Sequence, residues 1–249
     1  MKSKKLAAIL KSPYYLTRLL RHRVAAGVEH ERVLSGFDCR TVVDVGANRG
    51  QFALVARRCR PEARIISFEP LPPPAATFRA VFARDDQVTL HEVAIGPVLG
   101  NATIHVSRLD DSSSLLPITA TQVDLFPGTE EVATATVRLA PLREFIPAAD
   151  IHAPALLKLD VQGFELEALR GCEDLLDRFA YVYVECSFVE LYAGQAMADE
   201  VIAWLRERGF KLCGVHNMDY GCDGSAIQGD FLFARNHLPP PCNRDFRRD

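Results

Sequence analysis

The segment from Asp44 to Gly50, Asp-Val-Gly-Ala-Asn-Arg-Gly, constrains the fold of this chain most strongly. It follows the β-branched run 41–45 and precedes 51–58, which has helical character. Gly46 lets the chain turn sharply off a strand, and Gly50 lets a helix start approach a ligand without an intervening side chain. Free N–H groups at such a helix start favour an anionic or carboxylate-bearing ligand. The motif therefore predicts a nucleotide-like ligand, although an ordinary tight turn between strand and helix uses glycine as well.

The spacing of the glycines narrows the choice of ligand. A dinucleotide-binding turn has the pattern G-x-G-x-x-G, in which the second glycine makes room for the pyrophosphate. Here Ala47 and Asn48 follow Gly46, so that second glycine is absent. A nucleoside without a pyrophosphate fits better, and S-adenosylmethionine is such a ligand. An NAD-dependent oxidoreductase and a catalytically inactive nucleoside-binding module remain as alternative functions.

Strand-like runs alternate with helical segments along most of the chain. This alternation predicts right-handed βαβ units and a parallel sheet. The expected strands are 41–45, 64–68, 88–93, 155–160, 181–185, 211–215 and 230–234. The expected helices are 51–58, 72–82, 165–170 and 197–208.

Residues 97–152 interrupt this alternation. Short strands at 101–106 and 134–139 flank a polar stretch that includes Ser113, so we expect an inserted hairpin with a mobile loop. Loops of this length are usually functional lids or disordered segments. Ser113 is a candidate to line an acceptor pocket, although a solvated loop serine is an equally good interpretation.

The two ends of the chain differ from the rest. Residues 1–36 form a basic extension in which leucines recur at helical spacing, and Ser12-Pro13 suits the start of a helix. Such a helix could contact an anionic membrane surface weakly, but an apolar stripe more often packs against a protein core. Residues 236–249 are rich in Pro and Arg, and we expect a loose tail.

Composition excludes several classes of protein. The formal net charge of the 249 residues is -3, which gives no basic field to hold nucleic acid. The seven cysteines are odd in number and include no C-x-x-C pair, which suits a reducing compartment. No apolar run approaches the roughly 18 residues of a membrane-spanning helix, and 6–10 is too short for a signal-peptide core. We therefore expect a cytoplasmic protein.

Glu69 is the second indication of a nucleoside ligand. It ends the strand 64–68 and precedes Pro70. A carboxylate at this position can accept hydrogen bonds from both ribose hydroxyls of an adenosine. The alternative is a solvated loop glutamate. The position of Glu69 directly after an apolar strand disfavours this alternative.

The stretch from Lys158 to Glu165, Lys-Leu-Asp-Val-Gln-Gly-Phe-Glu, is the third indication. Asp160 falls at the carboxyl end of its strand, where open α/β sheets bind their ligands. Strand alternation places Lys158 and Asp160 on one face, and opposite charges on a buried strand are costly unless they are paired or functional. A structural ion pair, with Glu165 near a helix start, is the alternative to a direct role.

Taken in order along the chain, these motifs resemble the FkbM family of methyltransferases. The resemblance runs from about residue 41 to 235, and the ordered set is more specific than any one motif. It is carried by Asp44–Gly50, Phe68-Glu69-Pro70, Ala94-Ile95-Gly96, Lys158–Glu165, Glu185-Cys186-Ser187-Phe188, Leu191-Tyr192, Gly209-Phe210 and Gln228-Gly229-Asp230.

The resemblance implies an α/β class I methyltransferase fold. This fold has a doubly wound, Rossmann-like sheet of seven mostly parallel strands, the last antiparallel, here in a domain at 37–235. The implied cofactor is S-adenosylmethionine, and the implied reaction is O-methylation of a hydroxyl on a sugar, a glycan or a secondary metabolite. The residues expected at the donor are Asp44, Val45, Gly46, Ala47, Asn48 and Gly50 at the methionine part, Phe68, Glu69 and Pro70 at the ribose, Val93 and Ala94 near adenine, and Asp160.

Methyl transfer to a hydroxyl needs positioning and a base. Positioning supplies about 7–11 kcal/mol of effective concentration, and a base typically adds about 10²–10⁴-fold. The candidate catalytic residues are Asp160, which is best placed, Glu185, His216 and, beside Asp160, Lys158. His216 has the suitable pKa range, although a lone histidine is more often structural. A metal could replace the base, but the dispersed histidines lead us to expect no metal site.

Overall fold

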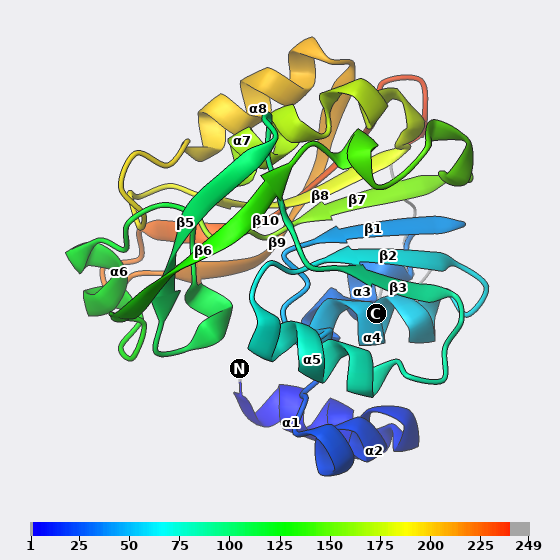
Figure 1. The fold of residues 1–249 in the computed structure, drawn as a ribbon, viewed down its shortest axis with the longest axis horizontal. Helices are drawn as coiled ribbons and strands as arrows, with labels where there is room; N and C mark the ends of the chain where they lie inside the picture. Colours follow the sequence, from blue (N-terminus) through cyan, green and yellow to red (C-terminus); the bar gives the residue numbers. More distant parts are fainter. Residues whose placement is uncertain (1, 240–249) are drawn as a thin grey trace.

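The computed structural model describes residues 2–239. Seven strands form the central sheet, and they are β1 Thr41–Val45, β2 Arg64–Phe68, β3 Val88–His91, β7 Ala155–Leu159, β8 Tyr181–Ser187, β9 Phe210–Tyr220 and β10 Ala226–Arg235. Their order in the sheet is β3-β2-β1-β7-β8-β10-β9 (Figure 1). The pairs from β3 to β8 are parallel, whereas β10 is antiparallel to both β8 and β9. The predicted fold class, with the last strand reversed, is confirmed.

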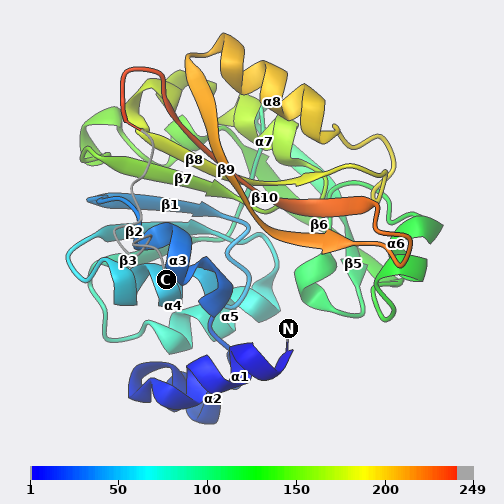
Figure 2. The same ribbon diagram turned by 180° about the vertical axis from the view of Figure 1, so that it is seen from behind.

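Helices cover both faces of this sheet, as a doubly wound fold requires. They are α3 Glu31–Leu34, α4 Gln51–Cys59 and α5 Pro72–Val81 on one face, and α7 Glu165–Gly171 and α8 Ala198–Glu207 on the other (Figures 1 and 2). Every residue of β1 and of β7 is buried. This double coverage explains why both strands are mostly apolar, and it also buries their polar residues Thr41, Asp44 and Lys158.

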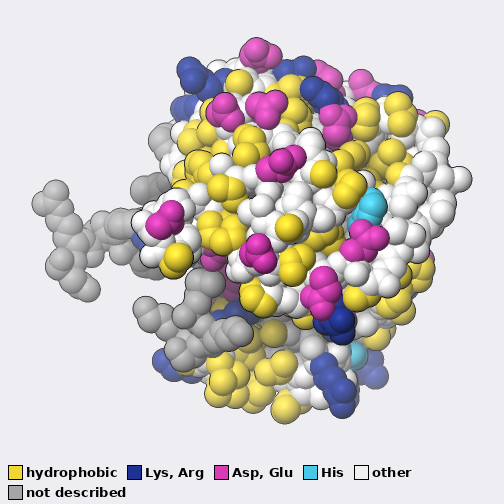
Figure 3. Space-filling view, turned by 90° about the vertical axis from the view of Figure 1, so that its left-hand side faces the viewer, with side chains coloured by type: hydrophobic (Ala, Val, Ile, Leu, Met, Phe, Trp, Pro, Cys, Tyr) yellow, Lys and Arg dark blue, Asp and Glu magenta, His cyan; other side chains and the backbone are white. Residues whose placement is uncertain are grey.

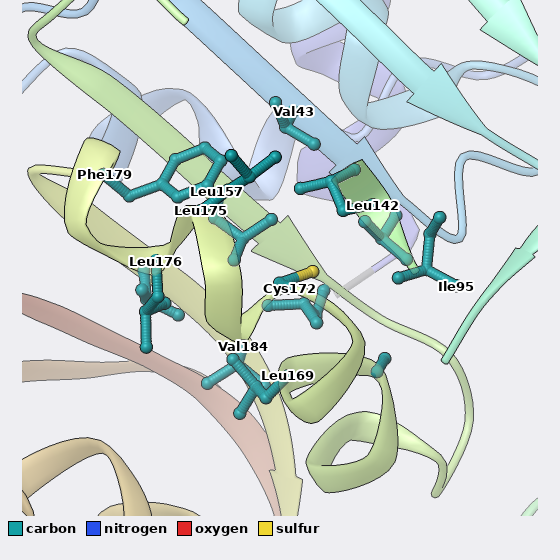
Figure 4. Packing of buried hydrophobic residues seen from close by; sticks show 14 of the residues in the cluster. Val43, Ile95, Leu142, Leu157, Leu169, Cys172, Leu175, Leu176, Phe179 and Val184 are labelled. Carbon is teal, nitrogen blue, oxygen red and sulfur yellow. The ribbon is translucent and has the colours of Figure 1, made fainter. Parts of the chain in front are cut away.

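The larger core lies between the sheet and α7. Val43, Leu157 and Val184 from three neighbouring strands pack with Leu169 and Cys172 (Figure 4). All five are fully buried. This packing fixes the strand ends that carry the candidate site residues.

The insertion forms a second, three-stranded sheet of order β4-β6-β5. Its hairpin joins β5 Gly100–Ser107 and β6 Glu131–Ala140 in antiparallel register, so the predicted hairpin is confirmed. The predicted strand 88–93 is wrong at its end, because β3 stops at His91 and β4 Ala94–Ile95 pairs with β6 instead. A short helix, α6 Ala120–Leu125, was not predicted, and β9 is longer than the expected 211–215.

The N-terminal extension packs beneath α5 as α1 Lys2–Lys11 and α2 Pro13–His22 (Figure 1). Ser12 caps α2, as predicted, by accepting a hydrogen bond from the Tyr15 N–H. Ile9 and Tyr15 are buried in the core cluster on this face of the sheet, and the Tyr15 hydroxyl donates to Glu31 at 2.6 Å. The extension therefore packs on the domain, and contact with a membrane surface stays a prediction. None of the helices in residues 2–239 is long and apolar enough to cross a membrane.

The predicted tail at 236–249 lies mostly outside the described residues. Its first part, 236–239, continues from β10, and the Asn236 N–H donates to the Gly209 carbonyl.

The packing of the extension can be tested with two apolar residues of opposite exposure. Ile9 is 2% exposed and Leu20 is 75% exposed. Ile9→Ala should lower the free energy of unfolding by about 2–5 kcal/mol, because it opens a cavity in a packed core. Leu20→Ala should change it by less than about 0.5 kcal/mol. Urea denaturation checks both values, and equal effects of the two changes would contradict the packing described.

Candidate active site

A cavity of about 230 Å³ opens at the carboxyl ends of β1, β2 and β7. Parallel sheets bind their ligands at this edge. The β-sheet side of its wall consists of Val45, Gly46, Ala47, Asn48, Phe68, Glu69, Pro70, Leu71, Val93, Ala94, Ile95, Lys158, Asp160, Val161, Gln162 and Phe164. The start of α4, the insertion and the N-terminal extension supply the rest, including Phe52, Ser113, Ser114, Gly27 and His30. The cavity thus collects most of the residues that the sequence indicated.

Two glycines of the first turn are required by close packing of the chain on itself. A Cβ at Gly46, whose φ is +81°, would lie 1.8 Å from the Asp160 carbonyl oxygen. A Cβ at Gly50, whose φ is +92°, would lie 2.7 Å from the Phe82 ring. Gly50 therefore faces α5 and does not line the cavity, so its missing side chain makes room for Phe82 and Phe78 instead of a ligand.

Glu69 is a buried carboxylate on the cavity wall. It is 5% exposed, so the solvated alternative does not hold. Its Oε2 accepts the Asn48 N–H at 2.9 Å, and its Oε1 accepts the Leu71 N–H at 2.8 Å. Burial raises the pKa of Glu69 to about 7, against the opposing effect of the two N–H donors. Each oxygen has a second lone pair, so the carboxylate can accept further hydrogen bonds from a ligand.

Lys158 joins the first turn to the end of β7. Its Nζ lies 3.1 Å from Asp44 Oδ1, 3.1 Å from the Gly46 carbonyl and 3.6 Å from Asp160 Oδ2. Burial alone would lower the pKa of Lys158, but Asp44 and Asp160 outweigh it, so the pKa is raised and Lys158 is a cation. Asp44 is fully buried behind the turn and does not line the cavity. Asp44 therefore supports the turn through Lys158 and does not itself face a ligand.

Gln162 holds Asp160 in place. Its φ is +56°, a left-handed conformation that is unusual for a residue other than glycine. Its Nε2 donates to Asp160 Oδ1 at 2.7 Å and to Glu185 Oε2 at 3.2 Å. The Tyr192 hydroxyl lies 2.7 Å from its Oε1, and the Ser114 hydroxyl donates to its carbonyl at 2.5 Å. Sequence analysis missed these roles, although Gln-Gly directly after a strand end is a signal for a left-handed turn.

Glu185 and His216 lie outside the cavity wall. Burial, and then the neighbouring Asp160, raises the pKa of Glu185 well above its usual range. The raised pKa means that the neutral form of the Glu185 carboxyl is favoured more than in an exposed glutamate. His216 lies on β9 in register with Asp230, and burial lowers its pKa. The structure brings Asp160 and Glu185 together through Gln162 and leaves His216 apart.

A histidine that the sequence analysis passed over lies on the cavity wall. His30 Nδ1 is 3.1 Å from the Tyr183 hydroxyl and 3.5 Å from Asp230 Oδ2. Asn217 Nδ2 also donates to Asp230 Oδ2, at 2.8 Å. His30 belongs to the N-terminal extension, and its partners stand far along the chain, so no local pattern could have indicated this network.

The insertion closes over the cavity. The Arg49 guanidinium, next to the first turn, pairs with Asp110 of the insertion through contacts of 2.5 and 3.1 Å. Ser113 lines the cavity, where its hydroxyl accepts the Ser107 N–H at 3.1 Å. Among residues 2–239, no three His, Cys, Asp or Glu side chains gather in a group that could hold a metal ion.

Comparison with known proteins agrees with this geometry. The family described as Methyltransferase FkbM domain matches residues 44–212. The protein "31-O-demethyl-FK506 methyltransferase FkbM" of Streptomyces tacrolimicus is 33% identical over 194 residues, which cover 68% of this chain and 72% of the relative. The protein "2-O-methyltransferase NoeI" of Sinorhizobium fredii is 29% identical over 160 residues, which cover 62% of this chain and 66% of the relative.

A third relative, "Hexuronic acid methyltransferase AglP" of Haloferax volcanii, is 29% identical over 145 residues. These residues cover 57% of this chain and 54% of the relative. The chain thus matches just under two thirds of the length of the NoeI protein and about half of the AglP protein.

Glu165 provides a test of the electrostatics beneath the site. It is 5% exposed, its Oε1 accepts the N–H groups of Val161 and Gly163, and burial raises its pKa to about 7. Since the unfolded value is about 4.3, the folded state holds this proton more tightly. The resulting stabilisation is fully present below about pH 4.3 and is lost as the pH rises through about 7.

Glu165→Gln should keep both hydrogen bonds and remove this titration. The difference in free energy of unfolding between wild type and variant should shift toward the wild type by up to about 3 kcal/mol from pH 8 to pH 5. Chemical denaturation at several pH values measures it. Glu62→Gln, at an exposed position, should keep the wild-type dependence. A Glu165→Gln profile parallel to the wild type would show that the Glu165 carboxyl does not titrate in this range.

Proposed function

The chain belongs to the FkbM family of methyltransferases, and we propose that it transfers a methyl group from S-adenosylmethionine to an acceptor hydroxyl. The acceptor is a sugar, a glycan or a secondary metabolite. The names of two relatives specify O-methylation, and the name of a third specifies a hexuronic acid. Because the family consists of methyltransferases, membership in it does not favour the alternative function of an NAD-dependent oxidoreductase.

The observation that carries the proposal is the buried carboxylate of Glu69 on the cavity wall. It is anchored by the N–H groups of Asn48 and Leu71, and it keeps acceptor capacity for two ribose hydroxyls. The apolar side chains of Val93, Ala94 and Phe164 line the same cavity and suit an adenine ring. The residues present thus fit the nucleoside part of S-adenosylmethionine.

The other end of the cavity suits an amino-acid group. Gly46, Ala47 and Asn48 line it, and Lys158 holds the Gly46 carbonyl from below. Ala47 and Asn48 occupy the positions where a dinucleotide-binding turn would leave room for a pyrophosphate. This support for the methionine part comes from the turn after β1, whose Asn48 N–H also anchors Glu69.

Asp160 is the base that the geometry favours. Bound S-adenosylmethionine supplies an electrophilic methyl carbon. The methyl group would pass to the acceptor oxygen as the carbon–sulfur bond breaks, and Asp160 would take the proton of the acceptor hydroxyl. Gln162 and Lys158 lie 2.7 and 3.6 Å from the two oxygens of Asp160, whereas Glu185 does not line the cavity. The products are a methyl ether and S-adenosylhomocysteine.

A cytoplasmic location and the absence of nucleic-acid partners stay predictions. The net charge of -3 and the free thiols of the described cysteines support them.

Glu69→Gln should weaken donor binding, because one of its two backbone contacts is lost and the charged acceptor for the ribose disappears. A hydrogen bond to a charged group contributes about 1.5–3 kcal/mol, so the Kd should rise at least about tenfold. Calorimetric titration with S-adenosylhomocysteine measures it, and NAD titrated in parallel tests the oxidoreductase alternative. Glu92→Gln, at an exposed position two residues before Ala94, should bind as the wild type does. Unchanged affinity in Glu69→Gln would remove the proposed ribose site.

Asp160→Asn should lower turnover about 10²–10⁴-fold, with donor affinity changed only a few fold. Release of S-adenosylhomocysteine over a panel of sugar and polyketide acceptors measures turnover. Asp86→Asn, at an exposed loop position, is the matched control. Wild-type turnover in Asp160→Asn would refute the role of base, and donor binding by the wild type without turnover on any acceptor would favour the inactive module.

A further inference from the structure

A second hollow adjoins the donor cavity. Its volume is about 450 Å³, and it lies between the insertion, the tip of β7 and the start of β10. Asp111, Asp160 and Gln162 line both spaces. Asp160 therefore faces the proposed donor on one side and this hollow on the other, which is the position that a base between donor and acceptor requires.

Amide groups make up much of the polar wall of the hollow. Gln122 of α6 is 3% exposed, and its Oε1 is buried without a hydrogen-bond partner among the described residues. A buried polar atom without a partner is costly, so a ligand that donates a hydrogen bond would relieve it. Gln228 lines the opposite side from β10, where its Nε2 makes only a long contact of 3.4 Å to Asp219.

Apolar side chains stand beside these amides. Leu109, Leu125, Phe126 and Pro127 all line the hollow. Leu109 is 50% exposed and Leu125 is 38% exposed, so both offer free apolar surface. An apolar surface next to several amides suits a sugar ring, which presents C–H groups on its faces and hydroxyls around its edge.

The charge of the hollow is negative. Asp111 and Asp160 line it, and no Lys or Arg is among its lining residues. The neighbouring Arg49 is already paired with Asp110. Figure 3 views the molecule from the side on which α6 lies, and it shows Asp and Glu over the middle of this face with Lys and Arg toward its upper and lower edges. Lys158 compensates Asp160 from within the protein, but no cation lines the hollow itself, so an anionic acceptor would meet Asp111 and Asp160 directly.

We propose that this hollow is the acceptor subsite and that it takes a neutral sugar, with its hydroxyls on Gln122 and Gln228 and its ring against Leu125 and Phe126. The inference rests on the proposed methyltransferase function and deepens it. The acceptor proposed for this chain is neutral, and it therefore differs from the hexuronic acid in the name of the AglP relative.

The substrate class is tested by binding to the full chain saturated with S-adenosylhomocysteine. The probes are neutral methyl hexosides and methyl 6-deoxyhexosides, each hexoside paired with its methyl uronoside, and ligand-observed NMR measures their binding. The neutral glycosides should bind in the millimolar range or tighter. The uronosides should bind at least about ten times more weakly, because of the carboxylates that line the hollow.

The location of the subsite is tested with three variants. Gln122→Leu and Gln228→Leu remove the amides, and Leu125→Trp fills the hollow from an exposed helix position. Each should weaken glycoside binding at least about tenfold and leave the affinity for S-adenosylhomocysteine within about twofold. Gln87→Leu, at an exposed position before β3, is the matched control and should bind both ligands normally.

The outcomes separate the two proposals. If S-adenosylhomocysteine itself does not bind, the proposed function fails and the inference fails with it. If S-adenosylhomocysteine binds but neutral glycosides do not, or uronosides bind equally well, the inference alone is overturned. Wild-type glycoside affinity in a folded Leu125→Trp variant would likewise exclude the hollow as the subsite.

Discussion

The buried cation Lys158 is the interaction on which the rest of the site depends. It stands between two carboxylates and a backbone carbonyl, and so it ties β1, the turn after β1 and the tip of β7 to one point. Removing one partner of such a buried pair costs about 3–5 kcal/mol, because the other charge is left uncompensated. The identity of Asp44 is thus explained by a contact inside the protein, and the same contact sets where Gly46 and Asp160 stand. The ion pairs of Lys158 therefore determine both where Gly46 and Asp160 lie and which charges stand at this edge of the sheet.

The sequence predicted best the elements whose signal is local. β1 and β2 begin and end as predicted, because strands covered on both faces are mostly apolar runs. Glu69 and Asp160 were found since the carboxyl ends of parallel strands meet at one edge. α6 and β4 were missed because they are short, and pairing with distant segments decides their conformation.

The misplaced and missing site residues have a different cause. A glycine at position 50 looks the same in the sequence whether it makes room for a ligand or for the Phe82 ring. Only the packing of α5 in the folded chain shows that it makes room for Phe82. His30 and Gln162 acquire their roles from partners on other elements, among them Asp230, Glu185 and Tyr192. Such networks are properties of the folded chain, and local patterns do not contain them.

The network around His30 also joins distant parts of the chain beside the cavity. His30 and Asp230 stand near opposite ends of the chain, yet their side chains lie 3.5 Å apart beside the cavity. Since β10 lies between β8 and β9, Asp230 is paired with neighbouring strands on both sides. Asp230 does not line the cavity, whereas His30 does, so His30 links the cavity wall to the edge strands of the sheet. A change in the packing of β10 is therefore transmitted to the cavity wall through a histidine from the other end of the sequence.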